Sequence, residues 1–175
     1  MWVSLIRPHI DYCSQLWSPG EGPLLDSIER LQYDYTKLSP ETRNLTYTER
    51  LKKFAITSIQ RRFERYKIMY LYKINQKVVP NCGVTIASDR NTRCGLKYVI
   101  PMIKESANGT LLEQTFQISG PKIWNVLPVF IRNLDGDDQS HFKSELDNYL
   151  MNFEDIPRVG HSKMRKNSLI DILGF

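Results

Sequence analysis

Basic side chains gather between Tyr47 and Lys77, where they alternate with aromatic ones. This stretch holds nine of the 24 Lys and Arg residues against only Glu49 and Glu64, so it carries net +7 while the rest of the chain sums to −2. Arginine binds phosphate groups bidentately, and an aromatic ring can stack on an unpaired base. The residue types therefore predict contact with a nucleic-acid backbone.

The candidate contact residues are those expected to face away from the core. Along residues 59–77 an apolar stripe at helical spacing should pack inside, which leaves the arginines on the solvent side. We expect phosphate contacts from Lys52, Lys53, Arg61, Arg62, Arg65 and Lys73, with Tyr72 as the residue that stacks on a base. We assign Phe63, Trp17 and Trp124 to the core. A solvated helix face that only keeps the domain soluble is the alternative explanation of the same pattern.

No set of residues has the spacing of a catalytic or metal site. The three histidines are far apart, the glycines are dispersed, and the three cysteines lack the paired spacing of zinc ligands. The acidic pairs Asp137-Asp138 and Glu154-Asp155 are better explained as helix-end charges than as the carboxylates of a two-metal enzyme. We therefore expect no catalytic residue, no cofactor and no metal.

Size and composition indicate a folded domain. The chain has 175 residues, 41% of them hydrophobic, and its net charge of +5 is compatible with a nucleic-acid partner. Three cysteines without a close pair fit a reducing compartment. The N-terminus lacks a signal peptide, and no apolar run reaches the length of a membrane span. We expect no membrane partner and an intracellular protein, cytoplasmic or nuclear, that is not secreted.

The pattern predicts an α+β fold that is mainly helical. Helices are expected over 2–17, either continuous or bent at Pro8, over 24–38, from a capping box at Thr46–Glu49 to about Phe54, and over 59–77. After a break at 79–81, short strands are expected at 84–87, 97–103 and 115–118, followed by a short helix opened by Ser119-Gly-Pro121 and a last helix from about His141 to Phe153. The expected division is a helical module over 1–79, an α+β part with two helices over 80–156, and a basic, partly disordered tail over 157–175.

Six blocks of this sequence resemble, in order and spacing, the segment that follows the polymerase palm in LINE-type (non-LTR) retrotransposon reverse transcriptases. They include LIRPHIDYCSQLWSP, IERLQ, LTYTERLKKF and FQISGPKIWNVLP, and together they extend over about residues 3–153. The blocks are Leu5–Pro19, Leu25–Gln32, Leu45–Phe54, Arg61–Ile74, Phe116–Pro128 and Phe142–Leu150.

The resemblance implies a thumb-like helical module at residues 1–79 followed by an appendage. In that family the thumb holds the template–primer duplex by its backbone, so this chain is expected to bind RNA or an RNA–DNA hybrid without regard to sequence. The fingers, the palm and its metal-binding aspartates are absent from the chain, so we expect no enzyme activity of its own.

Other functions remain open from the sequence. The chain could be a structural or protein-interaction module in which the acidic segment 134–155, with net −6, folds back and neutralises the basic helix. It could also be an inert remnant of a decayed element, or a free-standing enzyme whose catalytic set the sequence does not display. Self-neutralisation requires acidic residues of the segment within salt-bridge reach of Arg61, Arg62 and Arg65; the candidates are Asp135, Asp137, Asp138, Glu145 and Asp147.

Overall fold

A computed structural model describes residues 2–20, 22–87, 97–102, 109–134, 138–157, 159 and 167–174. The described chain is mainly helical with one small antiparallel sheet, which confirms the predicted fold class. Its first half contains η1 (Trp2–Ile6), α1 (Arg7–Asp11), α2 (Ser14–Trp17), α3 (Pro23–Lys37), η2 (Pro40–Thr42), α4 (Tyr47–Lys53) and α5 (Ile59–Asn75). Its second half contains β1 (Thr85–Ile86), β2 (Tyr98–Val99), α6 (Gly109–Gln114), α7 (Phe116–Val126), α8 (Val129–Arg132), α9 (Gln139–Met151) and α10 (Leu169–Leu173).

Local capping sets where the basic helices begin. The predicted capping box is present at α4: the Glu49 amide donates to Thr46 Oγ1, and the Thr46 amide donates to Glu49 Oε2 at 2.7 Å. At α5 the amide of Arg61 donates to Ser58 Oγ at 3.2 Å. These bonds satisfy amides that have no partner within the first turn of a helix.

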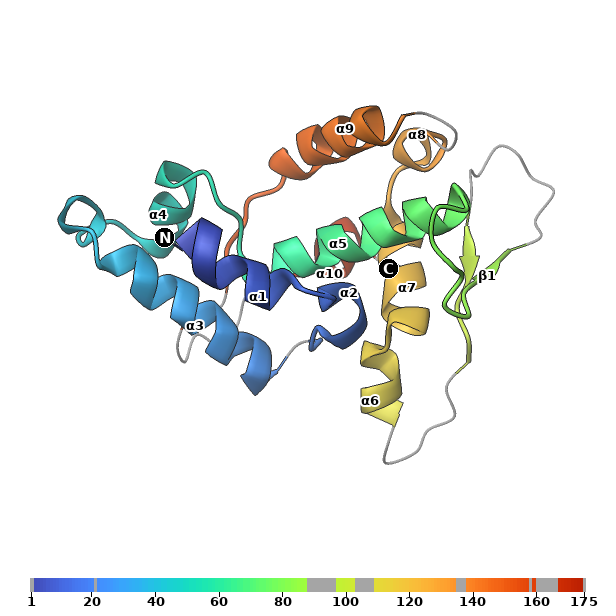
Figure 1. The fold of residues 1–175 in the computed structure, drawn as a ribbon, viewed down its shortest axis with the longest axis horizontal. Helices are drawn as coiled ribbons and strands as arrows, with labels where there is room; N and C mark the ends of the chain where they lie inside the picture. The colour runs from blue at the N-terminus through green and yellow to red at the C-terminus, as the bar shows by residue number, and fades with distance from the viewer. Residues whose placement is uncertain are drawn as a thin grey trace.

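Helix α5 is the central element of the fold (Figure 1). It contacts α2 and α3 in the first half of the chain and α7 in the second. The larger apolar core joins Leu71 of α5 to Trp124 of α7, Phe142 of α9 and Leu169 of α10, and all four are almost fully buried. The predicted module boundary after residue 79 therefore separates two parts of the chain that share one apolar core.

One predicted strand is wrong. Residues 116–118 open α7, which runs on through Pro121 instead of starting there. Its buried residues Phe116, Gly120, Ile123 and Trp124 are spaced by four, three and one, which is one face of a helix. The other two predicted strands are confirmed in shortened form, with Thr85 paired to Val99 and Ile86 to Tyr98.

The predicted N-terminal helix is divided in the structure. The π-helix η1 passes directly into α1 next to Pro8, which lies in the first turn of α1. The break comes at Cys13, whose φ of 51° is left-handed and separates α1 from α2. Trp17, predicted to be core, is 42% exposed; its ring edge packs on Phe63 and its Nε1 donates to the Tyr12 carbonyl at 2.6 Å.

The end of the predicted tail is a helix that docks into the fold. Helix α10 contacts α7, and the amide of Leu169 and the hydroxyl of Ser168 donate to the Glu64 carboxylate on α5. The described helices include none with the length and apolar character needed to cross a membrane.

Candidate nucleic-acid interface

The three arginines of α5 are predicted to lie on the solvent side of the helix, but in the structure they are largely buried. Arg61 is 3% exposed, and the side chains of Arg62 and Arg65 are 16% and 20% exposed. The sequence pattern assumed a helix covered on one side, whereas α5 is covered by elements from both halves of the chain.

Arg62 is held by the N-terminal helix. Its Nε donates to Asp11 Oδ1 at 2.6 Å and its Nη2 to Asp11 Oδ2 at 2.5 Å. Tyr66 joins the same cluster, accepting from Arg62 at 2.6 Å and donating to Asp11 at 3.1 Å. Arg7 lies 3.8 Å from the same carboxylate. Two guanidinium groups thus share one aspartate, and burial together with the nearby Arg62 lowers the pKa of Arg7.

Arg65 is held by α9. Its Nε and Nη2 donate to the two carboxylate oxygens of Asp147 at 2.5 and 2.8 Å, and these bonds raise the pKa of Arg65. One contact of the self-neutralised alternative is therefore present. Asp138 and Glu145 make no ion pair with the three arginines among the described residues, and Asp135 and Asp137 lie outside those residues.

Arg61 makes no hydrogen bond and no ion pair in the described part of the chain, although its charge interacts with that of Glu64. All three of its guanidinium nitrogens are buried, and none makes a hydrogen bond. It lies between Ser58, which caps the helix, and Glu64, whose carboxylate is occupied by Ser168 and Leu169. A buried cation without a hydrogen-bonded counterion is costly, on the order of several kcal/mol.

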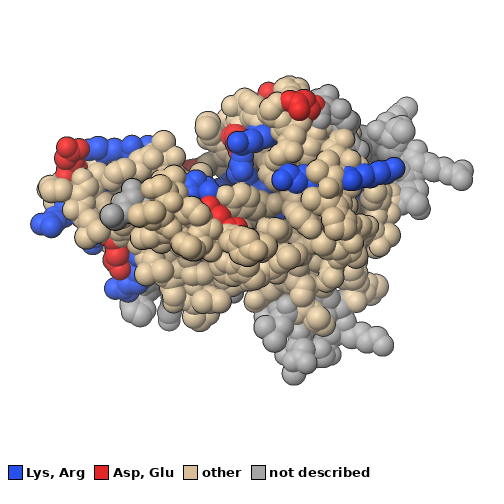
Figure 2. All heavy atoms as spheres, viewed as in Figure 1, with Lys and Arg blue, Asp and Glu red and all other residues tan. Residues whose placement is uncertain are grey.

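The three arginines line one groove of about 960 Å³ between α4, α5 and the end of α9. Figure 2 shows it as a hollow between the part of the molecule that carries α3 and α4 and the part that carries α9, with Lys and Arg side chains along it. The charged residues that line it are the basic Arg7, Lys52, Arg61, Arg62, Arg65 and Lys143 and the acidic Asp147, Glu154 and Asp155. The lining is therefore predominantly basic.

Of the three lysines predicted to contact phosphate, one lines the groove and two do not. Lys52 is exposed and lines the groove, whereas Lys53 points to Glu41, with its Nζ 3.4 Å from that carboxylate. Lys73 is half-buried and does not line the groove.

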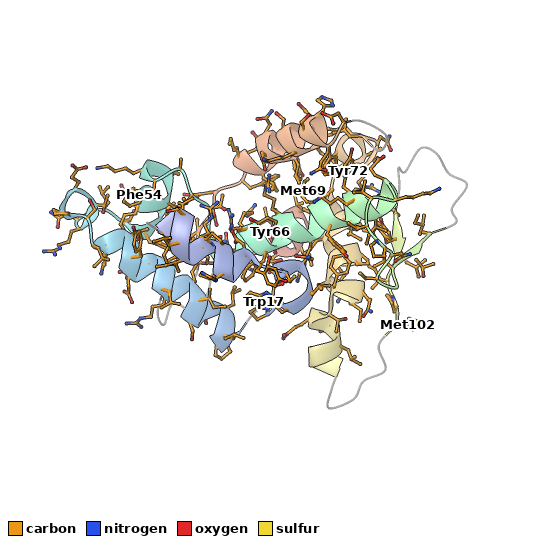
Figure 3. The ribbon with its side chains drawn as sticks, viewed as in Figure 1. Trp17, Phe54, Tyr66, Met69, Tyr72 and Met102 are labelled. Carbon is orange, nitrogen blue, oxygen red and sulfur yellow. The ribbon has the colours of Figure 1, made fainter. Side chains whose placement is uncertain are left out.

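Tyr72 cannot stack on a base in this structure. It is 2% exposed, and its ring stacks on Phe142 with centroids 4.0 Å apart. Figure 3 shows it on the side of α5 that faces α8 and α9. The predicted outward orientation of Tyr72 is wrong because α9 covers that side of the helix.

Sequence reasoning missed two cations of the groove and two buried carboxylates. Arg7 and Lys143 come from α1 and α9, and nothing in their local sequence connects them to α5. Glu29 accepts from Tyr47 Oη at 2.5 Å and from the Ile59 amide at 2.8 Å, and burial raises its pKa to about 7. Burial likewise raises the pKa of Glu64 to about 7.

No protein family, curated protein or solved structure was found to match this chain. Within the described residues, no group of three or more His, Cys, Asp and Glu side chains is placed to hold a metal ion.

Proposed function

We propose that the chain binds the phosphate backbone of RNA or of an RNA–DNA hybrid in the groove between α4, α5 and α9, without preference for base sequence. The observation that carries this proposal is Arg61, a buried guanidinium whose three nitrogens lack acceptors at the wall of a basic groove. Phosphate oxygens are the acceptors that a guanidinium group matches best in shape and charge.

The exposed cations of the groove make the first contacts. Lys52 and Lys143 are exposed, so a backbone can reach them without any rearrangement. The nitrogens of Arg61 are covered from solvent, so a phosphate reaches them only when a covering side chain moves. Binding therefore proceeds from the rim of the groove to Arg61.

The aspartates that hold Arg62 and Arg65 act as internal substitutes for phosphate. Asp11 and Asp147 each present two oxygens to a guanidinium group, which is the geometry that a phosphate offers. A bound backbone must displace them before these two arginines can contribute, so we expect modest affinity.

We further propose that the chain is the non-catalytic C-terminal segment, thumb and beyond, of a reverse transcriptase similar to those of LINE-type non-LTR retrotransposons. Support comes from the six resembling blocks, several of which coincide with successive helices. The block Leu25–Gln32 lies in α3, Phe142–Leu150 lies in α9, and Arg61–Ile74 lies in α5 at the groove. In such a protein the groove would contact the template–primer duplex, and the polymerase chemistry would take place in the palm domain, which this sequence does not include.

A self-neutralised structural or protein-interaction module is the second candidate. The Arg65–Asp147 pair favours it, because it joins the basic helix to the acidic segment 134–155. Arg61 counts against it, since no described residue of the acidic segment forms an ion pair with that side chain; the carboxyl group whose charge interacts with Arg61, that of Glu64, belongs to α5 itself.

A salt series distinguishes the two candidates. Fluorescence anisotropy of a labelled RNA–DNA hybrid is measured between about 50 and 200 mM salt for the native chain and for the Lys52→Ala/Lys143→Ala variant. Contact with about four phosphates predicts a slope of roughly −3 to −4 in log affinity against log salt, reduced by about 2 in the variant.

The matched control is Arg30→Ala/Lys97→Ala, which removes two exposed cations that do not line the groove. Its slope should equal that of the native chain. A flat salt response of the native chain, or equal losses in both variants, would exclude the groove as the binding site.

A further inference from the structure

A second cavity lies on a different face of α5. It has a volume of about 410 Å³ and is lined by Gln60, Phe63, Glu64 and Lys67 of that helix, none of which lines the basic groove. Its remaining walls come mainly from α3, α6, α7 and α10, including the apolar Leu25, Ile123 and Ile170. This volume is within the range of small-molecule sites, and the lining combines polar and apolar side chains.

Lys67 is the unusual residue of this cavity. It is 5% exposed, and its ammonium group makes no hydrogen bond or ion pair in the described part of the chain. Glu64, one turn earlier on the same face, is the charged neighbour that favours the protonated form. Burial outweighs that attraction and lowers the pKa of Lys67 to about 8. At neutral pH a far larger fraction of Lys67 is therefore the free amine than of an exposed lysine.

Hydrogen bonds from Ser168 and Leu169 hold the carboxyl group of Glu64 in place. Its oxygens accept from Ser168 Oγ at 2.7 Å and from the Leu169 amide at 3.1 and 3.2 Å, so it cannot swing away from the cavity without undocking α10. Burial raises its pKa to about 7, so near neutral pH it can hold or release a proton.

We infer that Lys67 is a reactive amine and that this cavity admits a small aldehyde or ketone, which Lys67 converts to an imine. The amine nitrogen attacks the carbonyl carbon, and a proton moves from nitrogen to the former carbonyl oxygen to give a carbinolamine. Loss of that hydroxyl as water, with one proton supplied by Glu64, leaves the iminium ion. No electron transfer is involved, and the step needs no further reactant.

Other charged groups face the same cavity. Glu113 of α6 and Lys122 of α7 form a 3.7 Å pair, and Asp171 comes from α10. Lys122 is already held by Glu113, whereas Lys67 has the nearby charge of Glu64 but no hydrogen-bonded partner among the described residues that line the cavity.

Reductive trapping tests this inference. The full chain is incubated with pyridoxal and sodium cyanoborohydride, which delivers hydride to the iminium carbon, and each labelled lysine is mapped by mass spectrometry. Lys67 should be labelled at least about tenfold faster at pH 7 than the exposed Lys52 and Lys97. Its rate should level off near pH 8, whereas the rates at Lys52 and Lys97 should keep rising.

Two variants separate reactivity from structure. Lys67→Arg should lose this label and leave the other lysines unchanged. Glu64→Gln should move the midpoint of Lys67 labelling to lower pH, because it removes the charge that favours the ammonium form. Labelling of Lys67 no faster than of Lys52 and Lys97, or a midpoint near that of an exposed lysine, would overturn the inference. Since the two sites share no residue, loss of nucleic-acid binding does not bear on this result.

Discussion

Buried ionisable side chains carry most of the information at the scale of single residues. Glu29 joins three helices, because it belongs to α3 and accepts hydrogen bonds from Tyr47 of α4 and from the first amide of α5. Arg61 and Lys67, on the same helix α5, are buried and make no hydrogen bond or ion pair among the described residues, although the charge of Glu64 interacts with both. Glu29 thus helps to hold three helices together, whereas Arg61 and Lys67 are the residues on which the two proposed sites depend.

Glu29 should make the stability of the protein fall as pH rises. Burial raises its pKa from 4.5 to about 7, so the folded state keeps a proton that the unfolded chain releases near pH 4.5. Stability from this group is therefore fully present below about pH 4.5 and is lost as pH rises through 7. Glu29→Gln should remove this loss, on the order of 3 kcal/mol, from the pH dependence of urea unfolding. If the free energy of unfolding depended on pH in the same way in both proteins, the pKa of Glu29 would not be raised by folding.

Asp147→Asn should tighten binding of an RNA–DNA hybrid. The substitution releases Arg65 into the groove and removes a negative charge from its wall. The pair is partly exposed, so the stability lost should stay below about 1 kcal/mol. Anisotropy titration at fixed salt measures the change, with Asp34→Asn, which releases Arg30 on α3, as the control. Unchanged affinity would mean that Arg65 takes no part in binding.

At the scale of elements, α5 is the helix around which the others are placed. Helix α9 covers one side of it and closes the groove, while α10 docks on Glu64 beside the second cavity. The two candidate sites therefore depend on elements that are distant from α5 in the sequence.

Removing the anchor of α10 should destabilise the whole fold. Leu169 is fully buried in the same core as Leu71 and Trp124. Leu169→Ala should lower the free energy of unfolding by about 2–5 kcal/mol in urea denaturation. The matched control, Leu38→Ala, truncates a leucine that is 72% exposed and should cost less than about 0.5 kcal/mol. Equal effects of the two variants would show that α10 is not part of the core.

Local signals made several elements predictable. The capping box at Thr46 and the apolar spacing along residues 59–77 identify α4 and α5 without knowledge of their neighbours. The predicted strand at 115–118 failed because Pro121 was interpreted as the start of a helix that already ran from Phe116.

The groove was only partly predictable, because burial depends on partners that are remote in sequence. The sequence identified Lys52, Arg61, Arg62 and Arg65 by their charge, and all four line the groove. It could not show that Asp11, 51 positions before Arg62, and Asp147, 82 positions after Arg65, would occupy two of these arginines. The burial of Tyr72 has the same origin, since the ring that covers it belongs to α9.

At the scale of the whole molecule, one groove carries six basic side chains against three acidic ones, and a second cavity, which contains Lys67, lies on another face of the same helix. A buried unpaired cation is a stability defect in the free protein that a bound anion would relieve. If the proposed function is right, Arg61 should affect both the stability of the free protein and its affinity for the nucleic acid.

The most direct test of that claim is urea unfolding of the native chain and of Arg61→Met, each with and without an excess of RNA–DNA hybrid. Methionine fills a similar space without a charge, so the variant alone should be more stable than the native chain by about 1–4 kcal/mol. The hybrid should raise the unfolding midpoint of the native chain and raise that of the variant much less. A variant that is less stable alone and gains as much from the hybrid as the native chain would contradict the assignment of Arg61 as a phosphate-binding residue.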